Sequence, residues 1–264
     1  MKILKYYEIW KINLLNSLMY FSDFIFYSVF IGVIIFIFVN LWRNLYSTTS
    51  VIEGFTLVMM IWYLVLTESM VVNIGGTTLI KELNQEVKSG DLIYVLNKPY
   101  NYVAYHYVKS LCQWMLGFTT SFIIAGLVAL FFVGALEFSL ITLPFILVIL
   151  LFSFTIDFTI SAILGISAFW MEDTTSFKYV YEKIIFILGG MLIPLEIFPE
   201  WLRIISAKLP FSYIAYHPAK LFVMFSFKSF LWIMLAQLSY VIFFGIILVI
   251  LYKLAVRKVN LHGG

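Results

Sequence analysis

Three carboxylic acids interrupt apolar stretches of this 264-residue chain, and they are the side chains best suited to chemistry inside a membrane. Asp157 lies near the middle of one stretch, whereas Glu68 and Asp23 lie near the ends of two others. An ionisable group in hydrocarbon is costly and by default marks a substrate or proton pathway. We therefore expect Asp157 and Glu68 to line a translocation pathway. For Glu68 and Asp23 the alternative is a position near the cytoplasmic interface, solvated or paired with basic residues. A polar contact between helices is the alternative for Asp157, supported by its hydroxyl-bearing neighbours Ser153, Thr155, Thr159 and Ser161.

Motifs for other chemistries are absent from the sequence. It contains no GxxxxGK[ST], HExxH, CxxC or GxSxG pattern, so no phosphate-binding loop, metalloprotease site, thiol pair or serine nucleophile is predicted. The three histidines, His106, His217 and His262, lie far apart without ligand spacing. The sequence therefore predicts neither an enzyme nor a metal site, and no cofactor bound by this chain.

A charged segment, residues 77–109, separates two apolar stretches. Apolar residues at spacings of three and four, among them Ile80 and Leu83, predict an amphipathic helix over 77–87. Gly90 follows as a terminator, and a second short helix over 91–96 would end before Pro99. The two helices would form a compact polar projection that fits a groove on a protein partner; an uninvolved surface loop is the alternative.

The composition indicates an integral membrane protein, because 63% of the residues are hydrophobic, 12% are charged and the mean hydropathy is +1.01. Each helical crossing takes about 20 apolar residues. Six stretches approach that length, at about 20–42, 55–75, 111–134, 139–170, 179–197 and 232–255. They are continuously apolar, unlike the alternating strands of a membrane barrel. The predicted fold is a single all-α membrane domain, residues 1–264, with six transmembrane helices.

The amino-terminal residues 1–18 predict an amphipathic helix on the membrane surface, with a polar extension of the first span as the alternative. The apolar positions that recur at helical spacing are Ile3, Tyr7, Trp10, Leu14 and Leu18. The single cysteine, Cys112, excludes an internal disulfide and is expected to face lipid.

The distribution of basic residues predicts that both termini are cytoplasmic. With this orientation, twelve of the 17 Lys and Arg residues fall on the cytoplasmic side and five outside. The net charge of +3 then needs no nucleic acid, and the aromatic residues and lysines between 94 and 109 match an interfacial belt. We expect contact with membrane lipid and none with nucleic acid. Abundant Lys, Ile and Phe indicate a prokaryotic cell membrane.

Residues 198–230 precede the last apolar stretch and would lie outside. An interfacial or re-entrant helix is predicted to begin near Pro199. Its apolar face consists of Trp201, Ile204, Ile205 and Leu209. Two of the aromatic residues that follow, Tyr213 and Tyr216, are candidates for contact with a translocated amphiphile. Interfacial anchoring explains the same residues without a substrate.

Two sequence patterns together suggest a family. Glu86, Gly90, Leu92, Leu96 and Pro99 form the pattern E-x3-G-x-L-x3-L-x2-P, followed by Lys109 at the start of the third predicted span. Gly189, Gly190 and Pro194 then precede FPEWLRIISAKLPFSY at 198–213. With six spans and an amphipathic amino terminus, the chain resembles the type-2 permeases of ATP-binding-cassette transporters over essentially its whole length.

The resemblance implies half of a dimeric exporter, in which two permeases, identical or homologous, associate with two copies of a cytosolic ATPase that binds ATP and Mg²⁺. Residues 1–18 would be the elbow helix, 77–109 the coupling-helix segment and 198–230 a set of short exterior helices. The residues expected at the ATPase-coupling interface are Glu82, Glu86, Lys88, Gly90, Asp91, Leu96 and Pro99.

The few charges within the spans favour a hydrophobic or amphipathic substrate such as a lipid, drug or peptide. The alternative function is an ion-coupled secondary transporter that uses Asp157 and Glu68 as coupling groups. No repeat of three-span halves in the sequence supports that alternative.

Overall fold

The helices of the structure follow the apolar and amphipathic stretches of the sequence. A computed structural model describes residues 2–71, 76–89, 98, 100–171 and 174–262. These residues are 84% helical and form no β-strand. The predicted all-α class is therefore confirmed, and the long apolar helices agree with an integral membrane protein.

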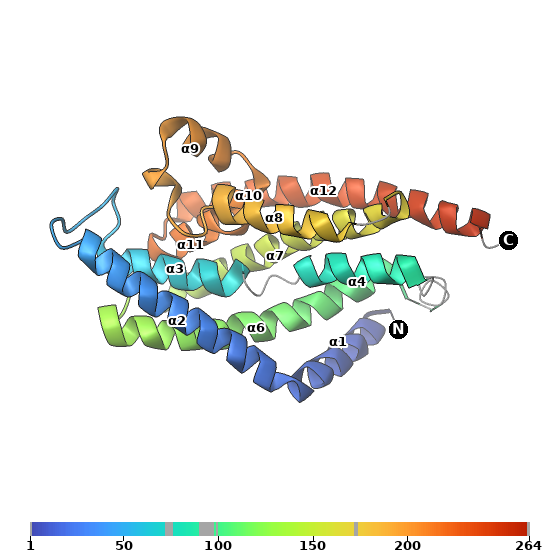
Figure 1. Cartoon of the computed structure of the whole chain (residues 1–264), viewed down its shortest axis with the longest axis horizontal. Helices are drawn as coiled ribbons and strands as arrows, with labels where there is room; N and C mark the ends of the chain where they lie inside the picture. Colours follow the sequence, from blue (N-terminus) through green and yellow to red (C-terminus); the bar gives the residue numbers. More distant parts are fainter. Residues whose placement is uncertain (1, 72–75, 90–97, 99, 172–173, 263–264) are drawn as a thin grey trace.

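The described helices lie side by side in a bundle (Figure 1). Along the chain they are α1 (Lys2–Met19), α2 (Phe21–Leu45), α3 (Leu57–Val71), α4 (Gly76–Ser89), α6 (Tyr102–Val133), α7 (Leu143–Ile166), α8 (Thr175–Leu188), α9 (Glu200–Ala207), α10 (Pro210–Ile214), α11 (Tyr216–Val223) and α12 (Phe227–His262). Short 3-10 helices are η1 (Leu140–Thr142), η2 (Ser167–Phe169) and η3 (Leu195–Ile197). The chain reverses between long helices, so that α2, α6 and α8 run away from the end that holds both termini, and α3, α7 and α12 run towards it (Figure 1).

Four helices in the described part of the chain are long and apolar enough to cross a membrane. They are Phe21–Leu45, Tyr102–Val133, Leu140–Phe169 and Phe227–Arg257, and they match four of the predicted stretches. α6 begins at Tyr102 rather than at 111, because the Asn101 side chain accepts a hydrogen bond of 2.9 Å from the Ala104 backbone N–H and caps the helix. Its polar first turns hide this start from a hydropathy pattern.

The other two predicted stretches form shorter helices. α3 has 15 residues and α8 has 14, which gives each a length of about 20 Å against a hydrocarbon core of about 30 Å. α3 is nevertheless enclosed by protein, because every residue from Met60 to Met70 is buried. Helix length thus identifies four crossings, and a six-span topology rests on α3 and α8 in addition.

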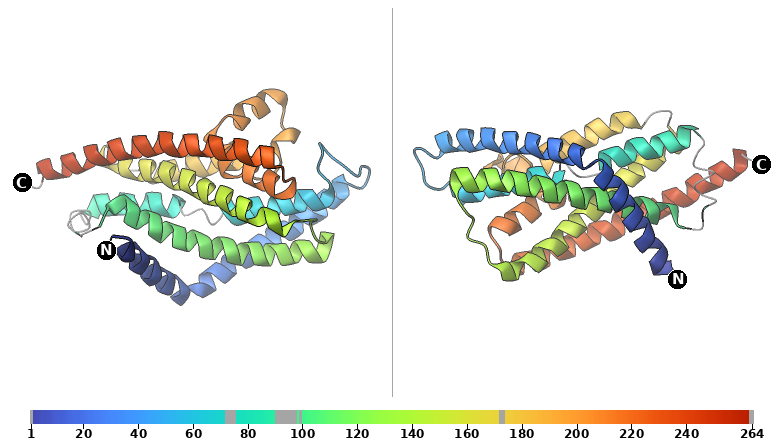
Figure 2. Two further views of the ribbon diagram at one scale, coloured as in Figure 1. Left: turned by 180° about the vertical axis from the view of Figure 1, so that it is seen from behind. Right: turned by 90° about the horizontal axis from the view of Figure 1, so that it is seen from below.

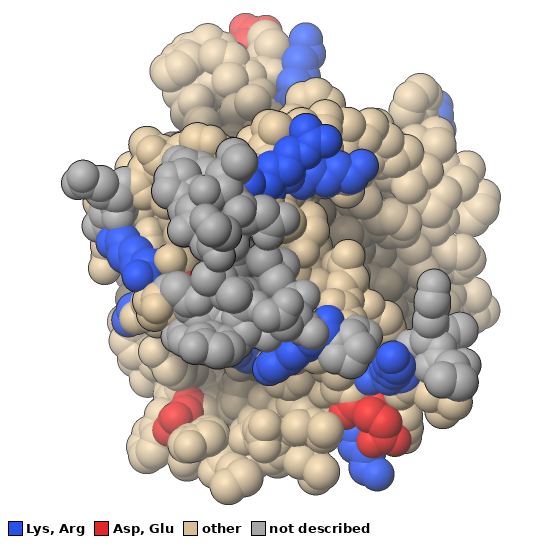
Figure 3. Space-filling model, turned by 90° about the vertical axis from the view of Figure 1, so that its right-hand side faces the viewer, with Lys and Arg blue, Asp and Glu red and all other residues tan. Residues whose placement is uncertain are grey.

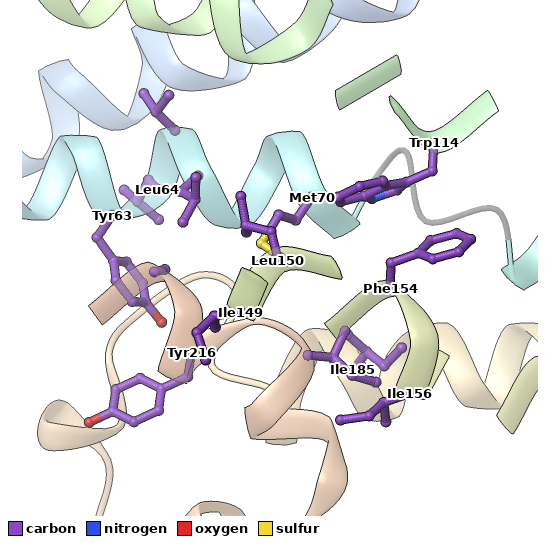
Figure 4. Packing of buried hydrophobic residues seen from close by; sticks show 14 of the residues in the cluster. Tyr63, Leu64, Met70, Trp114, Ile149, Leu150, Phe154, Ile156, Ile185 and Tyr216 are labelled. Atoms are coloured by element: carbon purple, nitrogen blue, oxygen red, sulfur yellow. The ribbon is translucent and has the colours of Figure 1, made fainter. Parts of the chain in front are cut away.

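The core surrounds α3, which packs against α2, α6 and α11. The side chain of Met70 on α3 reaches that of Leu150 on α7 (Figure 4). The rings of Trp114 on α6 and Phe154 on α7 have centroids 5.2 Å apart. Large apolar side chains from helices distant in sequence therefore interlock, and burial of this kind stabilises the bundle.

α4 packs along α7 rather than standing clear of the bundle. It covers the predicted range 77–87, and its Leu79, Ile80 and Leu83 are buried. The close approach depends on Gly165 of α7, where a Cβ would lie 2.7 Å from Leu83 Cδ1 and 2.9 Å from Leu83 Cβ. A side chain at 165 would push α4 outwards.

The amino-terminal helix α1 turns sharply away from α2 (Figure 2). It packs against α6 and leaves Leu4, Tyr7 and Leu18 exposed, as expected of a helix that meets lipid. Cys112 is buried on α6, so the expectation that it faces lipid was wrong. The reason is that α6 packs against α1, α2 and α3, which leaves little of its surface free near that position.

Short helices cover the opposite end of the bundle. α9 begins directly after Pro199 and stands off the other helices, with Trp201, Ile204 and Ile205 exposed (Figure 1). α10 is fastened to the bundle by Gln237 of α12, whose Nε2 donates to the Tyr213 carbonyl at 3.0 Å and to Ser153 Oγ at 2.9 Å. These contacts hold the segment around Tyr213 and Tyr216 in place.

Candidate functional site

Two carboxylates of α4 meet polar side chains from the first turns of α6. Lys109 Nζ donates a hydrogen bond to Glu82 Oε1. Glu86 Oε2 accepts a hydrogen bond of 2.5 Å from the Tyr102 hydroxyl and lies 3.3 Å from His106 Nε2. We call Glu82, Glu86, Tyr102, His106 and Lys109 the α4–α6 cluster. The spacing explains it, because Glu82 and Glu86 are one turn apart on α4, while Tyr102, His106 and Lys109 share one side of α6.

The α4–α6 cluster keeps Glu86 charged. Burial alone would raise the pKa of its carboxyl, but the hydrogen bond from Tyr102 and the neighbouring His106 and Lys109 outweigh burial and lower that pKa. Lys109 and Glu82 are both partly buried, which shields their ion pair from solvent more than a surface pair. The cluster is therefore a polar joint between α4 and α6.

Glu82, Glu86 and His106 offer possible metal-ligand atoms that lie within 4.8 Å of one another. Glu82 Oε1 already accepts a hydrogen bond from Lys109, and Glu86 Oε2 already accepts one from the Tyr102 hydroxyl. A divalent cation would have to displace both donors and sit beside an ammonium group. The donor set favours an ion-pair cluster over a metal centre.

The last turn of α4 points towards the end of the molecule that holds both termini (Figure 1). Asn84 Nδ2 donates to Thr174 Oγ1 at 2.6 Å, which ties α4 to the chain just before α8. Lys88 is exposed in the last turn. Gly90, Asp91, Leu96 and Pro99 lie outside the described residues. Lys and Arg side chains predominate over Asp and Glu on the part of this end that is coloured by charge (Figure 3).

Glu68 and Asp157, the two acids expected in the pathway, lie on different helices. Asp157 of α7 is fully buried, and its Oδ1 accepts a hydrogen bond of 2.7 Å from the hydroxyl of Tyr181 on α8. Glu68 is buried near the end of α3, with an exposed fraction of 2%. The contact at Asp157 joins two helices, as in the structural alternative considered for this residue.

Tyr213 and Tyr216 have different environments. The Tyr216 hydroxyl donates to Glu196 Oε1 at 2.6 Å, and Lys220 Nζ donates to the same oxygen. Burial would raise the pKa of Glu196, but the hydrogen bonds from Lys220 and Tyr216 lower it. Tyr213 instead stacks on His217, with ring centroids 4.1 Å apart. Tyr213 and Tyr216 are therefore neighbours in the α10–α11 segment, at the end of the bundle away from the α4–α6 cluster (Figure 1).

Sequence reasoning found Glu82 and Glu86 but missed Tyr102, His106 and Lys109 as their partners. The signal was present in the first turns of α6, where these three residues recur at spacings of four and three opposite an i, i+4 pair of acids. Hydropathy obscured it by starting the span at 111. The pairing of Glu196 with Lys220 left no local pattern, since the two residues belong to separate short elements.

The family relationship rests on a comparison that covers most of the chain. A family model described as ABC-2 family transporter protein matches residues 29–263. The chain belongs to the ABC-2 transporter family. A search of the curated proteins finds no match.

Membership confirms the resemblance drawn from the sequence. An ABC-2 permease is a membrane component of a transporter and is not itself an ATPase, and such permeases work with an ABC ATPase subunit. The matched range contains the α4–α6 cluster together with Glu68, Asp157, Tyr213 and Tyr216.

Proposed function

We propose that this ABC-2 permease is half of a dimeric exporter for a hydrophobic or amphipathic substrate, and that α4 transmits the movements of a separate cytosolic ATPase. The second permease would be identical or homologous, and two ATPase copies would bind ATP and Mg²⁺. The proposed topology has six spans, α2, α3, α6, α7, α8 and α12, with both termini cytoplasmic in a prokaryotic cell membrane. α1 would be the elbow helix.

The α4–α6 cluster carries the proposal. α6 has 32 residues and is about 48 Å long, roughly 18 Å more than the hydrocarbon core is thick. The surplus allows the turns bearing Tyr102, His106 and Lys109 to project beyond the membrane and meet α4 there. A push on α4 would then act on α6 through Glu82 and Glu86, and on α7 through the contact of Leu83 with Gly165.

The ATPase would touch the outer end of α4. The proposed contact residues are exposed Lys88 and the neighbouring Gly90, Asp91, Leu96 and Pro99. Glu82 and Glu86 would pass the movement from α4 to α6. Paired groups within the permease suit transmission, because a rigid element passes on a displacement that a loose loop would absorb. The ion-coupled alternative finds less support, since Asp157 is engaged with Tyr181 between two helices.

Affinity purification of the tagged chain from its native membrane, followed by mass spectrometry, tests the proposal. We expect a cytosolic ATPase in stoichiometric amount, together with any second permease. The Glu86→Lys variant should still bind the ATPase. The ATP hydrolysis rate of the ATPase in that complex, divided by the rate of the free ATPase, should differ from the ratio for the parent. The matched control is Glu200→Lys on exposed α9, which should leave that ratio unchanged. Repeated purification of a folded, monodisperse chain without an ATPase would contradict the proposal.

A further inference from the structure

A cavity at the exterior end of α12 is distinct from the α4–α6 cluster. Its volume is about 690 Å³. The side chains that characterise its wall are Tyr213, His217, Lys220, Lys228, Trp232 and Leu235. Aromatic, aliphatic and cationic groups thus share one open space. Interfacial anchoring explains exposed aromatic residues and lysines, but it does not require a cavity of this size.

The charge of this cavity is positive. Lys228 is exposed and has no acidic partner among the described residues. Lys220 is paired with Glu196, which lies behind the wall rather than on it. His217 contributes no charge at neutral pH, because burial lowers its pKa to about 4. The two lysines and Glu196 leave a net charge of +1, which complements a phosphodiester.

An apolar track leads out of the cavity along α12. Leu235 belongs to both the cavity and the track. The exposed members, at helical spacing, are Leu231, Leu235, Leu238 and Ile242. From 231 to 242 the track covers about 16 Å, roughly half of a hydrocarbon core of about 30 Å. Its length therefore matches one leaflet, and Trp232 lies where the track meets the cavity, as aromatic residues do at membrane interfaces.

We infer that this cavity binds an anionic phospholipid of the outer leaflet, with its phosphate at Lys220 and Lys228 and an acyl chain on the α12 track. A soluble anion would use the lysines but not the track, and a neutral amphiphile would use the track but not the lysines. The inference rests on the cavity and its charge rather than on ATPase coupling, so its test is independent of the ATPase purification.

Tryptophan quenching in vesicles tests the site, with the full-length chain reconstituted at equal mole fractions of brominated phosphatidylglycerol or brominated phosphatidylcholine. We expect stronger quenching by phosphatidylglycerol, and loss of that excess in Trp232→Phe. Lys228→Gln should weaken the preference about fivefold, since one lysine near an anionic lipid contributes about 1 kcal/mol. The matched control is Lys208→Gln, an exposed exterior lysine outside the cavity wall, which should keep the preference.

Four outcomes would overturn the inference. The two lipids could quench equally, Lys228→Gln and Lys208→Gln could behave alike, or the excess could persist in Trp232→Phe and so place the lipid elsewhere. Reversal of the excess by soluble glycerol phosphate would assign the lysines to a free anion. Lys228 is exposed, so its substitution does not threaten the fold.

Discussion

Alanine at position 165 is expected to displace α4. Its Cβ would lie 2.9 Å from Leu83 Cβ, and ordinary carbon contacts begin near 3.4 Å. The Leu83 Cδ1 atom, at 2.7 Å, can rotate away, but Leu83 Cβ is fixed to the backbone. α4 must therefore retreat by about 0.5 Å, which would loosen the Asn84–Thr174 hydrogen bond as well. Overpacking of this kind costs about 1–3 kcal/mol.

Gly245→Ala is the matched control, because Gly245 also lies inside an apolar helix but a Cβ there would meet nothing within 4 Å. Both substitutions gain the helix propensity of alanine, about 1 kcal/mol, so their difference isolates the contact with α4. Thermal unfolding in detergent should give Gly165→Ala a Tm lower than that of Gly245→Ala by about 2–10 °C. The ATP hydrolysis rate of the ATPase in the complex, relative to the free ATPase, should change in Gly165→Ala and stay the same in Gly245→Ala. Equal Tm values for the two variants would refute the reasoning.

Three further outcomes are expected. The pKa of Glu86 is lowered in the folded protein, so ionised Glu86 stabilises the fold fully above its ordinary pKa of 4.5, and this stabilisation is lost as the pH falls through the lowered pKa. The Tm of the parent should therefore fall more steeply in acid than the Tm of Glu86→Gln. Parallel curves of Tm against pH would contradict this. Gly134 and Gly190 have φ of 89° and 70°, but only at Gly190 would a Cβ also be crowded. Gly134→Ala should lower the free energy of unfolding by about 1–3 kcal/mol and Gly190→Ala by more, as measured by denaturant unfolding. A double-mutant cycle on Glu82→Gln and Lys109→Gln should show a coupling of about 0.5–1 kcal/mol, and additive losses would show that the ion pair contributes nothing.

The sequence was sufficient for elements whose physics is local. Periodicity placed α4, because Ile80 and Leu83 recur on one side, and apolar length placed α2, α7 and α12. Glu82 and Glu86 were expected at the coupling interface from the family resemblance, and the structure brings them together with α6. Their role towards an ATPase stays a prediction.

Contacts between distant elements could not be read from the sequence. Nothing near Glu196 indicates that Lys220 will reach it, and nothing near Asp157 indicates Tyr181. The start of α6 was missed because a cap at Asn101 acts through one hydrogen bond, which a hydropathy average does not register. Such pairings are decided by packing of the whole bundle.

The enclosure of α3 constrains how the chain can be assembled during synthesis. Met60 to Met70 are buried against partners that include α6 and α11, and α11 begins only at Tyr216. A growing chain therefore delivers α3 well before all of its protein surroundings exist. Until α11 has been made, α3 lacks one of the helices that bury it in the folded bundle. Ribosomes that stall before Tyr216 would leave a helix that insertion factors must hold or proteases must remove.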